Sequence, residues 1–180
     1  MTSPWFFGGT RIASPTIGPD GTIYSFNGIA GTIVAIDGAS GALKWRRQYD
    51  DVARDHLEWR PVVRRTATVD GIITATDNGL LAFLDLNYLF PFGAQPYPQT
   101  RKIVVAQLDT ANGELLGWFE SRDSSGAFVI PDADGSIYLS LSGTATSIGY
   151  YGVDPKLPGF LRANLEPRAG LVALKPAPSR

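Results

Sequence analysis

The stretch that decides the fold is TIVAIDGASGALKW, residues 32–45. An apolar run ends in Asp37, a short turn follows, and a second run carries Trp45. The pattern returns at residues 103–118 as IVVAQLDTANGELLGW, with one more residue between its Gly and its Trp. Residues 170–175, GLVALK, look like the start of a third copy. The chain is therefore interpreted as a repeat protein.

A second sequence motif recurs three times: PDGTIY at 19–24, VDGIIT at 69–74 and ADGSIY at 133–138. Asp-Gly between β-prone runs predicts a tight hairpin turn, because Gly supplies the positive φ. Each repeat is thus predicted to hold four strands. Their expected ranges are 13–18, 22–27, 32–37 and 42–48, then 61–69, 71–77, 102–109 and 114–120, then 126–131, 136–142 and 169–175.

Several of these strands are unbroken apolar runs, such as 33–36 and 103–106. An unbroken run indicates burial on both faces of a sheet. Small four-stranded sheets stacked on one another are the blades of a propeller. The predicted fold is therefore all-β, with about three antiparallel blades at residues 13–50, 60–120 and 126–175. Residues 1–12, which carry Trp5, are predicted to be the outer strand of another blade.

The residues Ala35, Asp37, Gly41 and Trp45 resemble the Ala-x-Asp-x-x-x-Gly-x-x-x-Trp motif of the quinoprotein-like (PQQ-like) β-propeller repeat superfamily. In the second copy Gln107 replaces the motif Ala, and Trp118 is displaced by one residue. The resemblance implies that the Trp caps one blade against the next, while the Asp and Gly shape the turn. It also implies a periplasmic or extracellular location.

The composition excludes several classes of protein. The 180 residues carry a net charge of −1 and no Cys, so there is no disulfide, thiolate zinc site or Cys nucleophile. The near-zero charge gives no reason to expect nucleic acid as a partner. No apolar run is long enough for a membrane span, and the first residues do not predict a signal peptide.

Closed propellers have about four to eight blades, so about three blades predict an incomplete ring. We expect a fragment of a longer propeller. The alternatives are several chains that complete one ring and a closed four-bladed monomer. The expected partners are therefore further blades, in the same or a longer chain, together with a protein or small-molecule ligand.

The predicted binding face carries the long connections 49–59, 78–101 and 143–168, because long loops on a rigid scaffold usually hold function. It is rich in aromatic and Arg side chains, which dominate binding hot spots. They are Trp59, Tyr88, Phe90, Phe92, Tyr97, Tyr150, Tyr151, Phe160, Arg54, Arg60, Arg101, Arg162 and Arg168. The alternative is that these rings only pack the insertions onto the blades, and residues 78–85 could themselves form a strand.

Three groups of charged residues are candidate chemical sites. His56 lies among Asp50, Asp51, Asp55 and Glu58, a pattern that could bind metal or supply a base but that favours a solvated loop. Asp132 and Asp134 lack the ligand ladder of a calcium loop and favour turn chemistry. The basic pairs 46–47 and 64–65 are expected to pair locally or face solvent. No catalytic, cofactor-binding or metal-binding residue is predicted.

Two functions remain open. The first is a non-catalytic binding or scaffold module, as in outer-membrane assembly lipoproteins and sensor domains of the resembled superfamily. The second is part of an alcohol or sugar dehydrogenase that uses PQQ with calcium. The absence of a Cys pair and of matched calcium ligands favours the first.

Overall fold

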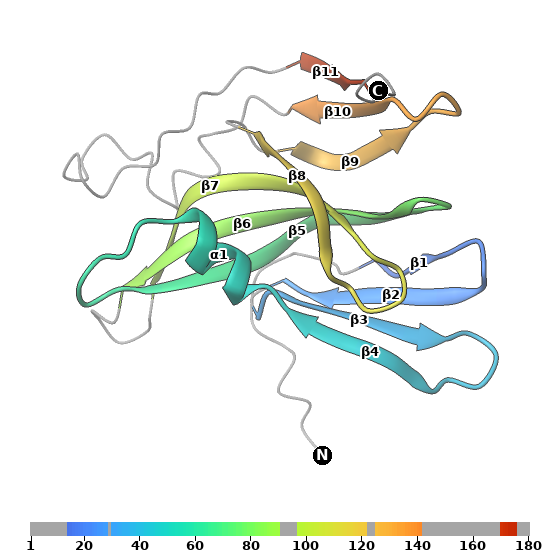
Figure 1. The fold of residues 1–180 in the computed structure, drawn as a ribbon, viewed down its shortest axis with the longest axis horizontal. Helices are drawn as coiled ribbons and strands as arrows, with labels where there is room; N and C mark the ends of the chain where they lie inside the picture. The colour runs from blue at the N-terminus through green and yellow to red at the C-terminus, as the bar shows by residue number, and fades with distance from the viewer. Residues whose placement is uncertain (1–13, 29, 91–96, 122–124, 142–169, 176–180) are drawn as a thin grey trace.

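The computed structural model describes residues 14–28, 30–90, 97–121, 125–141 and 170–175. These residues form three antiparallel sheets and one short helix, which confirms the predicted all-β class. The sheets lie one above another, with the second sheet in the middle (Figure 1). Residues 1–12, predicted to be a strand of another blade, lie outside the described residues.

The first sheet is a meander of four strands. Its strands are β1 (Thr16–Ile17), β2 (Thr22–Asn27), β3 (Thr32–Asp37) and β4 (Leu43–Gln48), in that order. The predicted ranges 22–27 and 32–37 are confirmed, whereas the predicted strand 13–18 is reduced to two residues. The connection from β1 to β2 is the predicted tight turn, closed by Gly18 and Thr22, whose backbone N–H and C=O lie 2.8 Å apart.

The segment after β4 was predicted as a solvated loop, and this prediction is wrong. Residues Asp50–His56 form helix α1, in which Asp50, Val52 and Ala53 are buried. Asp50 and Asp51 occupy the first helical turn and Arg54 and His56 the last, the distribution that the helix dipole favours. The apolar side of α1 joins the core between the first and second sheets.

The second sheet contains β5 (Arg64–Thr76), β6 (Gly79–Phe90), β7 (Tyr97–Leu108) and β8 (Leu115–Ser121), in that order. The predicted hairpin at Asp70-Gly71 is wrong, because β5 runs through both residues. Gly71 does adopt a positive φ of 70°, but it lies in an irregularity of the pairing between Asp70 and Thr74. The positive φ of Gly therefore serves a bulge here instead of a turn.

The turn itself lies at residues 77–78, and β6 begins immediately after it. The predicted insertion 78–101 is therefore largely β-structure, and the alternative that residues 78–85 form a strand is confirmed. The long strands β6 and β7 pair from Leu80↔Leu108 to Phe90↔Tyr97. This extension makes the second sheet longer than the first.

The third sheet contains β9 (Ser125–Pro131), β10 (Ile137–Leu141) and β11 (Gly170–Leu174), in the order β11-β10-β9. The three ranges agree with the predicted strands 126–131, 136–142 and 169–175. The predicted binding loop 143–168 lies outside the described residues.

Two hydrophobic cores hold the stack together. The larger core lies between the first and second sheets, and the smaller one between the second and third. Along β6, Leu80, Ala82 and Leu84 face the first core, whereas Leu81 and Phe83 face the second. This alternation explains the unbroken apolar run. The run at 103–106 is likewise buried throughout, but in the run at 33–36 Val34 and Ile36 are only half-buried.

Candidate functional site

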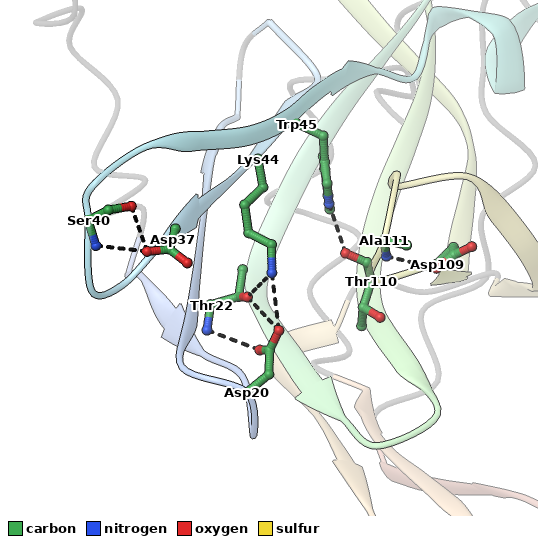
Figure 2. Close-up of polar contacts among 9 residues, drawn as sticks. All are labelled: Asp20, Thr22, Asp37, Ser40, Lys44, Trp45, Asp109, Thr110 and Ala111. Carbon is green, nitrogen blue, oxygen red and sulfur yellow. Dashed lines mark hydrogen bonds and ion pairs between the residues drawn. The ribbon is translucent and has the colours of Figure 1, made fainter.

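Trp45 connects the first two sheets. It lies on β4, and its indole Nε1 donates a hydrogen bond of 2.8 Å to the carbonyl oxygen of Thr110, in the turn between β7 and β8 (Figure 2). The face of the ring lies against Gly113, where an added Cβ would come within 2.7 Å of Trp45 Cζ3. Trp45 therefore fits only because residue 113 has no side chain. We call this contact the first junction.

Tyr49 strengthens the first junction. Its side chain is buried, and its hydroxyl donates a hydrogen bond of 2.9 Å to the carbonyl oxygen of Gly113. Burial raises the pKa of the Tyr49 phenol well above its ordinary value. Tyr24 completes the aromatic group, with its ring centroid 6.0 Å from that of Trp45.

The second copy of the motif places its Trp differently. The turns 37–42 and 109–114 have the same backbone hydrogen bonds, so Gly117 occupies the position of Trp45. Gly117 pairs with Gln107, and Trp118 pairs with Ala106, one residue further along. Because neighbouring residues of a strand point to opposite faces, the extra residue turns Trp118 away from the third sheet.

Trp118 meets α1 instead. Its side chain is half-exposed, and its ring contacts His56 edge to face with centroids 4.4 Å apart. The acidic residues around His56 in sequence make it a candidate metal ligand or base. Its described ring contact is with an indole, and the neighbouring acids Asp50 and Asp51 bind arginines.

The ion pairs near α1 confirm that arginines of the two basic pairs bind groups close to them in the fold. Arg47 lies 2.7 Å from Asp51, and Arg64 lies 2.6 Å from Asp50. Arg65 donates hydrogen bonds to the carbonyl oxygens of Arg54 and Leu57, at the end of the helix. Arg64 and Arg65 lie on β5 and fix α1 to the second sheet, whereas Arg47 lies on β4 and connects α1 to the first sheet.

Asp50 connects α1 to β5, a role that the sequence analysis did not predict. Its side chain is mostly buried, and one carboxylate oxygen accepts a hydrogen bond of 3.1 Å from the backbone N–H of Ala67. The other oxygen accepts from Arg64 and from Gln48. In sequence, Asp50 was only one of several acidic residues, and nothing local distinguished it from Asp51.

Of the aromatic side chains on the predicted binding face, some are buried and others are exposed. Tyr88 is buried, and its hydroxyl donates to the carbonyl oxygen of Glu58 at 2.7 Å. The Arg60 guanidinium lies 5.8 Å from the centre of the Tyr88 ring. Trp59, in contrast, is 71% exposed. The packing alternative therefore holds for Tyr88, whereas Trp59 is available to a ligand.

The side chains of most other members of that face lie outside the described residues: Phe90, Phe92, Tyr97, Tyr150, Tyr151, Phe160, Arg101, Arg162 and Arg168. Arg54 is exposed, like Trp59 five residues later.

A buried polar group lies on the second sheet, on the face that β6 shares with Phe83. Asn87 donates to the hydroxyl of Thr68 and to the carbonyl oxygen of Asp85. The hydroxyl of Thr100 donates to Asn87 at 2.9 Å. These bonds satisfy the buried amide, as a structural network requires.

Asp132 and Asp134 form the turn between β9 and β10. The Asp134 carboxylate accepts a hydrogen bond of 2.8 Å from the backbone N–H of Ser136, which lowers the pKa of Asp134. Thr22 and Asp20 make the same contact in the first sheet. Turn chemistry accounts for these acids, as predicted.

Across the described residues, no three His, Asp or Glu side chains gather closely enough to hold a metal ion together. The same residues contain no helix with both the length and the apolar character needed to cross a membrane. In the described part of the predicted face, Arg54 and Trp59 are exposed together with the acidic Asp55 and Glu58. Trp118, which lies outside the predicted face, contacts His56 of α1. We call Arg54, His56, Trp59 and Trp118 the α1 surface.

No protein-family model matches this chain, and no curated protein shows a significant match to it.

Proposed function

We propose that the chain is a non-catalytic binding or scaffold module of the PQQ-like β-propeller type, and a segment of a larger propeller. The observation that carries the proposal is the first junction, where Trp45 of one four-stranded sheet contacts the motif turn of the next. This contact joins the two copies of the motif on which the resemblance rests. The face-to-face packing of the meander sheets supports the same interpretation.

The proposed binding face is the side of the stack that carries α1. Here the side chains of Trp59, Trp118 and the cationic Arg54 are all exposed. Exposed Trp and Arg side chains on a rigid scaffold suit a protein or small-molecule ligand. The charged groups around α1 are already engaged with one another, as Arg47 is with Asp51 and Arg64 with Asp50. This arrangement favours binding over proton transfer. The proposed location is periplasmic or extracellular.

The test is dye-linked dehydrogenase turnover with added PQQ and calcium, together with calorimetric titration of PQQ. We expect no turnover of alcohols or sugars and no saturable PQQ binding, because among the described residues no three His, Asp or Glu side chains gather closely enough to hold calcium. A matched titration without calcium controls for nonspecific adsorption of the quinone. Chelator-sensitive turnover would overturn the proposal and favour a quinoprotein dehydrogenase.

The binding role itself is tested with the Trp59→Ala variant. Trp59 is 71% exposed, so its removal should leave the stability of the chain unchanged. The variant should lose affinity for whatever ligand the wild-type chain retains. Equal ligand retention by Trp59→Ala and by the wild type would remove Trp59 from the proposed face.

A further inference from the structure

Each sheet has two faces with separate roles. We call the face toward the next sheet in the chain the forward face, and the face toward the preceding sheet the rear face. The forward face of the first sheet packs on the rear face of the second, through residues such as Ile33 and Leu84. The forward face of the second sheet packs on the rear face of the third, through residues such as Phe83 and Leu139. One rear face and one forward face are left over.

The forward face of the third sheet repeats that of the first. In the first sheet Tyr24 pairs with Ala35, and in the third sheet Tyr138 pairs with Ala173. Two residues along the same face, Ile33 in the first sheet corresponds to Leu171 in the third. The third sheet therefore presents the same Tyr, Ala and aliphatic positions that the first sheet uses at its junction.

The exposure of these equivalent residues differs sharply. Ile33 is 0% exposed, because the second sheet covers it, whereas Leu171 is 67% exposed. Ile130 pairs with Tyr138 on the same forward face and is 53% exposed. The third sheet thus has a junction-type face with no sheet of the described residues on it.

The rear face of the first sheet carries an apolar row, next to the pair of Val34 with the exposed Arg46. Its registers align Ile17, Ile23, Ile36 and Leu43 in one row across all four strands. Ile17 is 70% exposed and Leu43 is 61% exposed. In the second sheet, the position of Ile36 is taken by Leu108, which is fully buried against the first sheet. The exposed row therefore occupies the positions that a preceding sheet would cover.

We propose that these two faces bind each other between two copies of this chain, with the forward face of the third sheet on the rear face of the first sheet of the next copy. The inference rests on the proposed function, because it treats the three sheets as equivalent blades. The two faces are complementary in kind, since forward and rear faces already pack on each other twice within the chain. Such a contact is head-to-tail, so a pair of copies keeps one free face of each kind, and a further copy can bind at either end.

The experiment uses sedimentation velocity on the full chain over a range of concentrations. The wild type is expected to associate reversibly. Leu43→Lys and Leu171→Lys should each raise the dissociation constant by about tenfold or more, because a lysine ammonium would be buried in an apolar contact. Leu116→Lys is the matched control, because Leu116 is 58% exposed on the second sheet and belongs to neither face.

Mixing the two variants gives the decisive result. Leu43→Lys keeps an intact forward face, and Leu171→Lys keeps an intact rear face, so an equimolar mixture should form a dimer that neither variant forms alone. Formation of this dimer also shows that both variants are folded. If one substitution abolishes association and the other leaves it intact, the contact joins two like faces and the proposal is wrong.

A wild-type chain that stays monomeric also overturns the proposal. A monomer that binds a hydrophobic dye would assign the faces to sheets of another protein. A monomer that binds the dye only after deletion of residues 1–12 would assign the rear face to the chain's own N-terminal segment. Neither result changes the outcome of the PQQ assay, so failure of this inference and failure of the proposed function are distinguishable.

Discussion

The two contacts between neighbouring sheets are built differently. At the first junction the Trp45 indole reaches across to Thr110 and Gly113, and the Tyr49 hydroxyl reaches the same glycine. At the second, the equivalent position is Gly117, and Gln107 donates to the carbonyl oxygen of Asn78 within its own sheet. A hydrogen bond of 2.8 Å from the Thr74 hydroxyl to the Val129 carbonyl connects the second and third sheets.

One inserted residue accounts for much of this difference. The repeat keeps its turn and its strands, but the added residue between Gly113 and Trp118 moves the Trp to the rear face. There the ring contacts His56 of α1. A repeat can therefore lose its Trp contact with the next sheet while it keeps the Asp, the Gly and the Trp of its motif.

The largest expected effect is at Trp45. Trp45→Ala should lower the free energy of unfolding by about 3–5 kcal/mol, because a buried aromatic ring and its cavity are involved. Trp118→Ala, its counterpart in the second copy, should cost only about 1 kcal/mol, since half of the ring is exposed and one aromatic contact is lost. Urea denaturation measures both values. Equal losses for the two variants would contradict the difference between the two Trp positions.

The second effect distinguishes the cost of backbone strain in the turn from the cost of a collision with the Trp45 ring. Gly41 and Gly113 hold the same turn position, with φ of 72° and 75°. Gly41→Ala should cost about 1–2 kcal/mol from backbone strain alone, since nothing lies within 4 Å of the added Cβ. Gly113→Ala should cost more, because the added Cβ would collide with Trp45.

Combining the substitutions isolates that collision. In a Trp45→Ala background, Gly113→Ala should cost no more than Gly41→Ala, because the ring has been removed. Thermal or urea unfolding of the four variants completes the cycle. A cost of Gly113→Ala that is unchanged in this background would show that the turn and the ring are independent.

The smallest effect concerns the turn of Asp20. Hydrogen bonds from the Thr22 hydroxyl and backbone N–H, with a further contribution from Lys44, lower the pKa of Asp20 from 3.8 to about 2. Because the folded-state pKa is the lower one, the stabilisation is present above pH 3.8 and is lost as the pH falls toward 2. Asp20→Asn should therefore flatten the loss of stability over this range.

Two further variants identify the cause of that shift. Thr22→Val should raise the pKa of Asp20 more than Lys44→Met does, because the Thr22 hydroxyl is the largest contributor. NMR titration of the Asp20 carboxyl measures the pKa directly. A larger rise in Lys44→Met would assign the shift to charge instead of hydrogen bonding.

Much of the fold was predictable because its signals are local. The recurring Asp-Gly turns and the unbroken apolar runs predicted β2, β3, β9, β10 and β11. Asp70-Gly71 misled the prediction because a positive φ fits a hairpin turn and a bulge equally well. The pairing of β5 with β6 decides between them, and that pairing depends on residues far from the turn. The helix α1 was missed because its seven residues are too few to show a clear period.

The candidate site was less predictable. Trp45 could be identified from its motif, but the carbonyl that it binds lies 65 residues away. Asp50 could not be distinguished, because its burial depends on the Ala67 backbone and on Arg64. The orientation of Trp118 could have been predicted by counting residues from Gly113, because one insertion reverses the face of a strand.

The apolar strand β6 affects the tendency of the protein to aggregate. Its residues 80–88 are buried without interruption, and the run from Leu80 to Leu84 contains no charge. Short apolar segments of this kind, with high β-propensity and low charge, are the ones that nucleate amyloid when they are exposed. The third sheet covers Leu81 and Phe83. Loss of that sheet, by proteolysis or truncation, would therefore expose these apolar side chains to water, while β6 would stay paired with β5 and β7.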